Sequence, residues 1–99
     1  MRLDIYANDV TGKQYDIEVQ QEDSGAVPER ARLNSALFDS RLTTSGEKYK
    51  EMPETYIIFI TSNDVLKGGL PVYTIERIIQ ETGELFRDKA HIVYVNGSY

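Results

Sequence analysis

The chain lacks or nearly lacks the residue types on which many functional sites depend. Among its 99 residues there is no cysteine, and His91 is the single histidine. This composition excludes disulfide scaffolds, thiolate zinc sites and cysteine nucleophiles, and it leaves carboxylates as the main ligands for a hard metal ion. A chain without cysteine is typical of a reducing compartment, so we expect a cytoplasmic protein.

Long apolar segments are also missing. Runs such as Tyr56 to Ile60 are far shorter than the ~20 residues of a membrane helix, and no basic and then apolar signal peptide opens the chain. We therefore expect no membrane association. A chain of this size buries roughly 60–65% of its unfolded surface, which allows one core, so a single domain over residues 1–99 is expected.

Basic residues are outnumbered by acidic ones. The 11 Lys and Arg against 16 Asp and Glu give a formal net charge of −5. Such a chain repels nucleic acid phosphates on average. Binding to nucleic acid would therefore need a local basic cluster, a metal ion or a basic partner.

The hydrophobic pattern predicts an α/β (α+β) fold with a mixed sheet. Residues 2–8 and 15–22 alternate apolar and polar around a turn, which indicates a β-hairpin. The continuous apolar run at 55–61 predicts a central strand covered on both faces. In chain order we expect strands at 2–8 and 15–22, an amphipathic helix at 29–42, and strands at 55–61, 72–80 and 91–96.

The stretch 72–80 fits two patterns. Tyr73, Ile75 and Ile79 alternate as in a strand, whereas Ile75, Ile78 and Ile79 have helical spacing with Gly83 just past the end. The high content of β-branched residues favours the strand, with the following loop leading back to the last strand.

The predicted hairpin gathers carboxylates on one face. That face carries Asp4, Tyr6 and Asn8 opposite Asp16, Glu18 and Gln20, and the other carries Leu3, Ile5 and Ala7 opposite Ile17 and Val19. Alternation alone explains a polar face turned to solvent and an apolar face turned to the core. A turn at residues 11 and 12 places Asp4 near Glu18 or Gln20. If Asp4 lies opposite Glu18, the pair is destabilising unless something compensates the two charges. A hard divalent ion would do so, and Gln20 could orient a metal-bound water or contact a phosphate oxygen.

Asp4, thirteen further residues and then Glu18-Val19-Gln20 form a spacing that resembles the active-site hairpin of the PD-(D/E)XK nuclease family transposases. These are relatives of the Rpn-type recombination-promoting nucleases, in which Gln often replaces the Lys of classical members. The resemblance continues, in the same order as in the family, over residues 28–32, 37–40, 56–64, 69–71 and 91–96.

The resemblance implies a restriction-endonuclease-like core and a transposase-related DNA endonuclease. It implies catalytic roles for Asp4, Glu18 and Gln20, with Asp4 and Glu18 as ligands to Mg²⁺ or Mn²⁺ and Gln20 helping to position the attacking water. DNA is the implied partner. Arg30 and Arg32, near the helix start, are the candidates for contact with its phosphate backbone.

Two departures from the family pattern favour an alternative. Family members have helical sequence before the first catalytic strand, where this chain has only Met1, and they continue beyond the segment that ends at Tyr99. We therefore expect a chain truncated at its N-terminus, with an uncovered sheet face that makes a homo-oligomer. The alternative function is an inactive remnant that acts as a self-associating or partner-binding module. A ligand-binding regulator is a third possibility, which no residue pattern singles out.

Other residues have simpler structural explanations. We expect His91 to be a hydrogen-bonding residue at the start of a strand, Asp64 to cap a loop, and Tyr56, Tyr73 and Tyr94 to pack within strands. The pair Gly68-Gly69 lacks the Lys and Ser or Thr that follow in a phosphate-binding loop.

Overall fold

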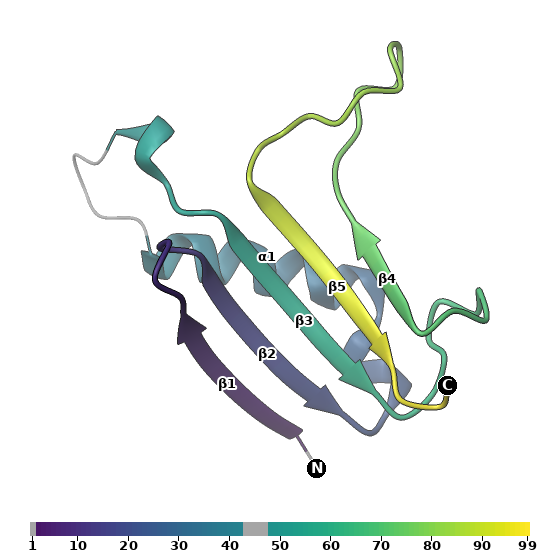
Figure 1. Cartoon of the computed structure of the whole chain (residues 1–99). Coiled ribbons are helices and arrows are strands. Elements are labelled where there is room, and N and C mark those ends of the chain that lie inside the picture. The colour runs from purple at the N-terminus through teal and green to yellow at the C-terminus, as the bar shows by residue number, and fades with distance from the viewer. Residues whose placement is uncertain (1, 43–47) are drawn as a thin grey trace.

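The computed structural model describes residues 2–42 and 48–99, which form a five-stranded sheet and one α-helix (Figure 1). Short 3₁₀ turns, η1 (Asp23–Ala26) and η2 (Tyr49–Glu51), precede α1 and β3. The α+β class and the order of the elements confirm the prediction. The elements are β1 (Arg2–Asn8), β2 (Gln14–Gln20), α1 (Pro28–Leu42), β3 (Thr55–Thr61), β4 (Val72–Ile75) and β5 (Ala90–Asn96).

The sheet is mixed, with strand order β1-β2-β3-β5-β4. The three inner strands β2, β3 and β5 are parallel, and the edge strands β1 and β4 pair with their neighbours antiparallel. The predicted central strand, β3, does lie in the middle. The mixed sheet predicted from the hydrophobic pattern is therefore confirmed.

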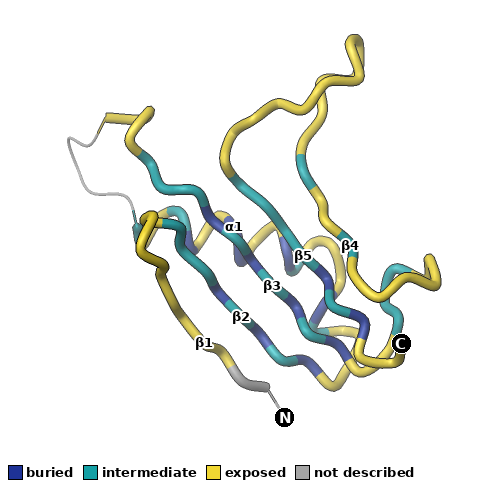
Figure 2. Tube along the Cα trace, in the orientation of Figure 1, coloured by how far each residue is buried: buried dark blue, intermediate teal, exposed yellow. Residues whose placement is uncertain are grey.

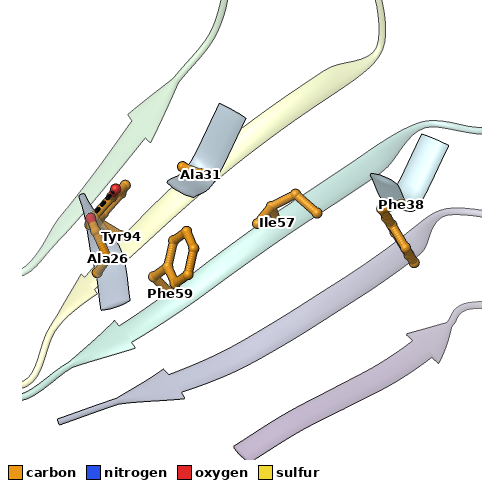
Figure 3. Packing of buried hydrophobic residues seen from close by; sticks show 6 residues of the cluster. All are labelled: Ala26, Ala31, Phe38, Ile57, Phe59 and Tyr94. Carbon is orange, nitrogen blue, oxygen red and sulfur yellow. Dashed lines mark hydrogen bonds between the residues drawn. The ribbon is translucent and has the colours of Figure 1, made fainter. Parts of the chain in front are cut away.

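The helix covers one face of the sheet, where the core lies (Figures 1 and 2). Ile57 and Phe59 of β3 are fully buried there beneath Ala31 and Phe38 of α1, beside Tyr94 of β5 (Figure 3). The expectation that β3 is covered on both faces is wrong for residues 2–42 and 48–99. On the other face Tyr56, Ile58 and Ile60 are only half-buried.

The same arrangement corrects the expected core side of the hairpin. Asp16 and Glu18 are each 2% exposed beneath α1, whereas Ile5, on the apolar face, is 44% exposed. The physical reason is the crossover from β2 through α1 to the parallel strand β3. Such connections are almost always right-handed, so handedness decides which face the helix covers, and here it covers the face that carries the carboxylates.

A projecting arm, residues 76–89, joins β4 to β5 (Figure 1). The strand predicted at 72–80 ends at Ile75, which pairs with Ile92 of β5. Beyond it the arm folds back on itself, with an isolated bridge between Ile78 and Leu85, a backbone hydrogen bond from Phe86 to the Arg77 carbonyl, and the Arg77–Asp88 ion pair at 2.7 Å. The strand is short because from Arg77 onward the chain pairs with residues of its own arm and not with β5.

Asp9 fixes the turn of the first hairpin. Its Oδ1 accepts hydrogen bonds from the backbone N–H groups of Thr11 (2.9 Å) and Lys13 (3.0 Å), and its Oδ2 accepts one from the hydroxyl of Tyr15 (2.9 Å). Gly12 takes the left-handed conformation that the turn needs, with φ 87°. The hydrogen bond from the Thr11 hydroxyl, with the other donors, lowers the pKa of Asp9 to about 2. The turn sets which residues of β1 and β2 face each other.

We predict that Asp9→Asn destabilises the protein at neutral pH, because an amide is a weaker acceptor than a carboxylate. A carboxyl whose folded pKa is lowered stabilises the fold above its ordinary pKa of 3.8, and this contribution is lost as the pH falls toward about 2. Urea unfolding midpoints of the two proteins should therefore converge at low pH. Glu81→Gln, on the exposed arm, is the control and should change the midpoint little at any pH. A constant gap between wild type and Asp9→Asn down to low pH would contradict the assignment.

Candidate active site

The hairpin places the two predicted metal ligands directly opposite each other. Asp4 of β1 pairs with Glu18 of β2, and the neighbouring pair on the same face is Tyr6 with Asp16. The sequence left Glu18 and Gln20 as possible neighbours of Asp4, and the structure pairs Asp4 with Glu18. Asp4 is exposed on the edge strand, whereas Glu18 lies beneath α1. The pair thus combines a buried carboxylate with one open to solvent.

Glu18 is held by hydrogen bonds to both carboxylate oxygens. The amide Nδ2 of Asn34 on α1 donates to Oε2 at 2.5 Å, and the amide Nε2 of Gln20 donates to Oε1 at 3.4 Å. Asn34 is itself buried, so its amide has a fixed position. A buried carboxylate stays ionised only where such donors offset the loss of water. The two amides therefore hold the Glu18 carboxylate in place beneath the helix.

Gln20 is buried, with only 6% of its surface exposed. A Cβ at Gly25, in η1, would lie only 2.1 Å from the Gln20 Oε1 atom, so the absence of a side chain at Gly25 makes room for the carboxamide. The structure therefore brings Gln20 together with Glu18, as its place two residues along the same strand predicts.

Asp16 is the third carboxyl group on this face, and its surroundings are the least satisfied. The residue is 2% exposed, and its Oδ1 atom has no hydrogen-bond partner among the described residues. Burial raises its pKa to about 7, with the negative charges of Glu18 and Asp4 adding to the effect. The carboxyl group of Asp16 therefore holds its proton more readily than an exposed aspartate does.

Arg41, near the end of α1, brings a positive charge to the edge of the site. Its guanidinium lies 4.7 Å from the centre of the Tyr6 ring and donates to the Tyr6 hydroxyl at 3.0 Å. The same ring stacks on Phe38 at 6.0 Å. A hollow of about 370 Å³ opens here, and Gln14 and Asn8 also line it. This gives an open surface beside the carboxylates.

The two predicted DNA-contacting arginines lie on different sides of α1. Arg30 is one turn before Asn34, so the helical repeat puts it on the side of the acidic hairpin. Arg32 lines a separate pocket with Ile75 and Glu76, toward β4. The structure therefore brings Arg30, but not Arg32, to the side of the carboxylates.

Sequence reasoning did not identify three residues of this site. It gave Asp16 no role beyond its place on the polar face, and it assigned no role in the site to Asn34 or Arg41. Asn34 carries a usable signal, because it shares the helical repeat with the apolar positions 31 and 38, and a polar residue on a buried helix face needs a partner. The position of Arg41 beside Tyr6 depends on how α1 crosses the hairpin, which the sequence pattern does not give.

The donors on this face fit a hard divalent ion in chemistry, since they are oxygen atoms of carboxylates. Within residues 2–42 and 48–99, no group of three or more His, Asp or Glu side chains is already arranged around one point. Asp4 is the side chain with room to move, since it is exposed on an edge strand. The Oδ1 atom of Asp16 is the one buried side-chain polar atom of the described residues that lacks a hydrogen-bond partner.

His91 and Asp64, for which the sequence predicts structural roles, have those roles in the structure. His91 contacts Glu54 at 2.6 Å and stacks on Tyr56 at 4.5 Å, on the sheet face opposite α1. Asp64 accepts hydrogen bonds from the backbone of Lys67 and Gly69, which caps its loop. Both predictions are confirmed. No helix in the described part of the chain is long and apolar enough to cross a membrane.

Comparison with known proteins gives one match. A family model described as "PD-(D/E)XK nuclease family transposase" covers residues 1–97 of the chain. Searches of the curated proteins and of the solved structures returned no match. The family match spans both strands of the acidic hairpin, α1 and all later strands.

We predict that Asn34→Ala lowers the free energy of unfolding by about 1–3 kcal/mol, because it removes a donor from a buried carboxylate. Asn63→Ala is the matched control, since Asn63 donates to Asp23 at 3.0 Å on the exposed surface, and it should cost less than about 0.5 kcal/mol. Urea denaturation followed by circular dichroism measures both. Equal losses would show that the buried contact adds nothing.

Proposed function

The chain belongs to the PD-(D/E)XK nuclease family transposases, and from this premise we propose that it is a metal-dependent DNA endonuclease domain that hydrolyses phosphodiester bonds. In this proposal residues 1–99 act as one domain. The family supports a transposase-related nuclease domain and does not favour the alternative of an inactive binding module.

The observation that supports catalysis most directly is the pairing of Asp4 with Glu18. Like charges directly opposite on neighbouring strands are unfavourable. Glu18 is also buried beneath a helix, and its burial costs further free energy, which the hydrogen bond from Asn34 offsets only in part. Because a protein that needed only stability could place neutral residues here, the pair is best explained by a positively charged ligand.

Asp4 and Glu18 would hold Mg²⁺ or Mn²⁺. When bound, such an ion polarises a phosphoryl oxygen and lowers the pKa of a coordinated water. Glu18 is the fixed ligand, because two amides orient it, and Asp4 is the adaptable one on the exposed edge. The Gln20 amide lies beside Glu18 and is suited to orient the attacking water or a phosphate oxygen, though it brings no charge.

Positive side chains on α1 would contact the DNA backbone. Arg30 lies on the hairpin side of the helix and Arg32 on the side of β4, so in this proposal they contact different phosphates. Arg41, beside Tyr6, adds a third positive charge at the edge of the site. These three arginines, spread along α1, would offset locally the formal net charge of −5, which on its own opposes binding to nucleic acid.

We also propose that two copies associate through the sheet face opposite α1, here called the open face. The open face carries uncharged apolar side chains on its three inner strands, each half-buried by its neighbours. They are Ile17, Val19, Ile58, Ile60, Val93 and Val95.

The dimensions of the open face favour a second copy as its occupant. Five strands of up to seven residues span roughly 20 Å by 23 Å in projection. A single helix, about 10 Å wide, would cover only half of this width, whereas a second sheet would match it. Because the six apolar residues of the open face carry no charge, two copies can face each other there without like-charge repulsion, and the two-fold symmetric contact is self-complementary. The ionisable groups His91, Glu54 and Glu76 lie together at one end of the face.

We predict that the protein nicks plasmid DNA in the presence of Mg²⁺ and that Glu18→Gln reduces the rate at least about 100-fold, because the variant keeps the shape of the side chain but loses its charge. Agarose gels that follow conversion of supercoiled to open-circular plasmid measure the rate. Glu29→Gln, an exposed carboxylate in the first turn of α1, is the control and should leave the rate unchanged. Nicking that survives Glu18→Gln unchanged would point to a contaminating nuclease.

For the open face, we predict a particle of twice the 11.3 kDa chain mass by size-exclusion chromatography with light scattering. Ile58→Lys places a charge at the centre of the open face and should give the monomer mass, because an unpaired ammonium resists burial. Val10→Lys, in the fully exposed hairpin turn, is the control and should stay dimeric. A wild-type protein that remains monomeric at all concentrations would refute the self-association.

A further inference from the structure

We infer that Asp16 is a third carboxylate donor to the divalent ion, with Oδ1 as the ligand atom. The inference rests on the proposed function and deepens it, since it adds a residue to the site formed by Asp4 and Glu18. It stands on the position of Asp16 and on the unsatisfied state of its side chain.

The first argument is position. Asp16 lies two residues before Glu18 on β2, so both side chains project from the same face. It pairs with Tyr6, two residues along β1 from Asp4, which makes Asp4 its diagonal neighbour across the hairpin. The three carboxyl groups thus lie at neighbouring positions on one face of the hairpin, although in the described residues they are not gathered around one point.

The second argument is the unsatisfied oxygen. Buried polar atoms nearly always have a hydrogen-bond partner, and a missing one costs about 1–3 kcal/mol. Asp16 is 2% exposed, yet its Oδ1 has no partner among the described residues. An acceptor atom left bare in the floor of an acidic site is suited to a cation.

The third argument is that no nearby donor takes this role. Arg41 acts on Asp16 by its charge, but its guanidinium donates to the hydroxyl of Tyr6 and lies over that ring. The amide of Asn34 donates to Glu18. Among the described residues neither group donates to Oδ1 of Asp16, and the side-chain contact of Asp16 is with the carboxyl group of Glu18.

The arrangement of charges supports the same conclusion. The carboxylates of Asp4 and Glu18 lie on the same face of the hairpin as Asp16, so the three groups repel one another unless a cation is present. A bound divalent ion reverses this balance, because it is the largest local charge in such a site. Two carboxylates leave most of a six-coordinate shell to water, whereas a third replaces one more water.

The test uses two ions: Mn²⁺, and Tb³⁺ as a hard luminescent probe of oxygen sites. Isothermal titration calorimetry gives the Mn²⁺ affinity, and Tb³⁺ luminescence lifetimes in H₂O and D₂O count the waters on the bound ion. Asp16→Asn should weaken Mn²⁺ binding about tenfold or more and raise the water count by about one. Asp39→Asn, which removes the charge of a half-buried carboxylate of α1, should change neither quantity.

The outcomes separate this inference from the proposed function. If wild type binds, Glu18→Gln does not, and Asp16→Asn matches Asp39→Asn, then Asp16 is not a ligand and the two-carboxylate site stands. Weaker binding with an unchanged water count would also overturn the inference, since it would show that Asp16 acts only through its charge. If wild type binds neither ion, the proposed metal site itself fails. Circular dichroism checks folding, and Asp16→Ser is measured by the same criteria should Asp16→Asn not fold.

Discussion

A carboxylate buried beneath a helix is the constraint on which the rest of this structure depends. Moving Glu18 out of water is costly, and the cost is offset only if donors reach both of its oxygens. Gln20 comes from the same strand, but Asn34 comes from α1, sixteen residues later. The helix can therefore sit over the hairpin in few positions, because a shift of one turn would remove the amide from Glu18.

The handedness of the crossover adds a second constraint, and together the two explain the unusual division of the sheet. A right-handed β2–α1–β3 connection puts the helix on the face that carries Asp16 and Glu18. The core must then be built on that face from the few apolar positions that remain, chiefly Ile57, Phe59 and Tyr94. The more regular apolar face of the hairpin is left without a covering helix in the described residues.

The sequence determines the local elements more clearly than their packing. Alternation and turn chemistry predict both strands of the hairpin, and the turn at Asp9 makes the pairing of Asp4 with Glu18 predictable. Alternation predicts the wrong core face, however. It identifies the more apolar face of the hairpin, but the handedness of the crossover determines which face the helix covers. The strand predicted at 72–80 ends early for a similar reason, since from Arg77 onward the chain pairs with its own arm, which the local pattern does not determine.

The residues of the candidate site also fall into those that local sequence pattern predicts and those that depend on packing. Asp4, Glu18 and Gln20 share one face through the two-residue period of a strand, which is a local property that the sequence carries. Asn34 and Arg41 reach the site only because α1 crosses the hairpin at a particular angle, which is a tertiary property. Asn34 was still detectable in principle, since its polar side chain interrupts the buried face of the helix.

The negative charge of the chain takes on a different meaning once it is located. Part of the formal charge of −5 is concentrated in Asp4, Asp16 and Glu18, which lie on one face of two strands. Their mutual repulsion destabilises the folded protein alone, and a divalent cation would turn the same repulsion into binding free energy. A charge that opposes DNA binding at long range can thus favour it at the site, because each carboxylate neutralised by the ion removes one source of repulsion toward the incoming phosphate. The unfavourable pairing of Asp4 with Glu18 is then a cost of folding that binding recovers, which explains why a small domain with little stability to spare retains it.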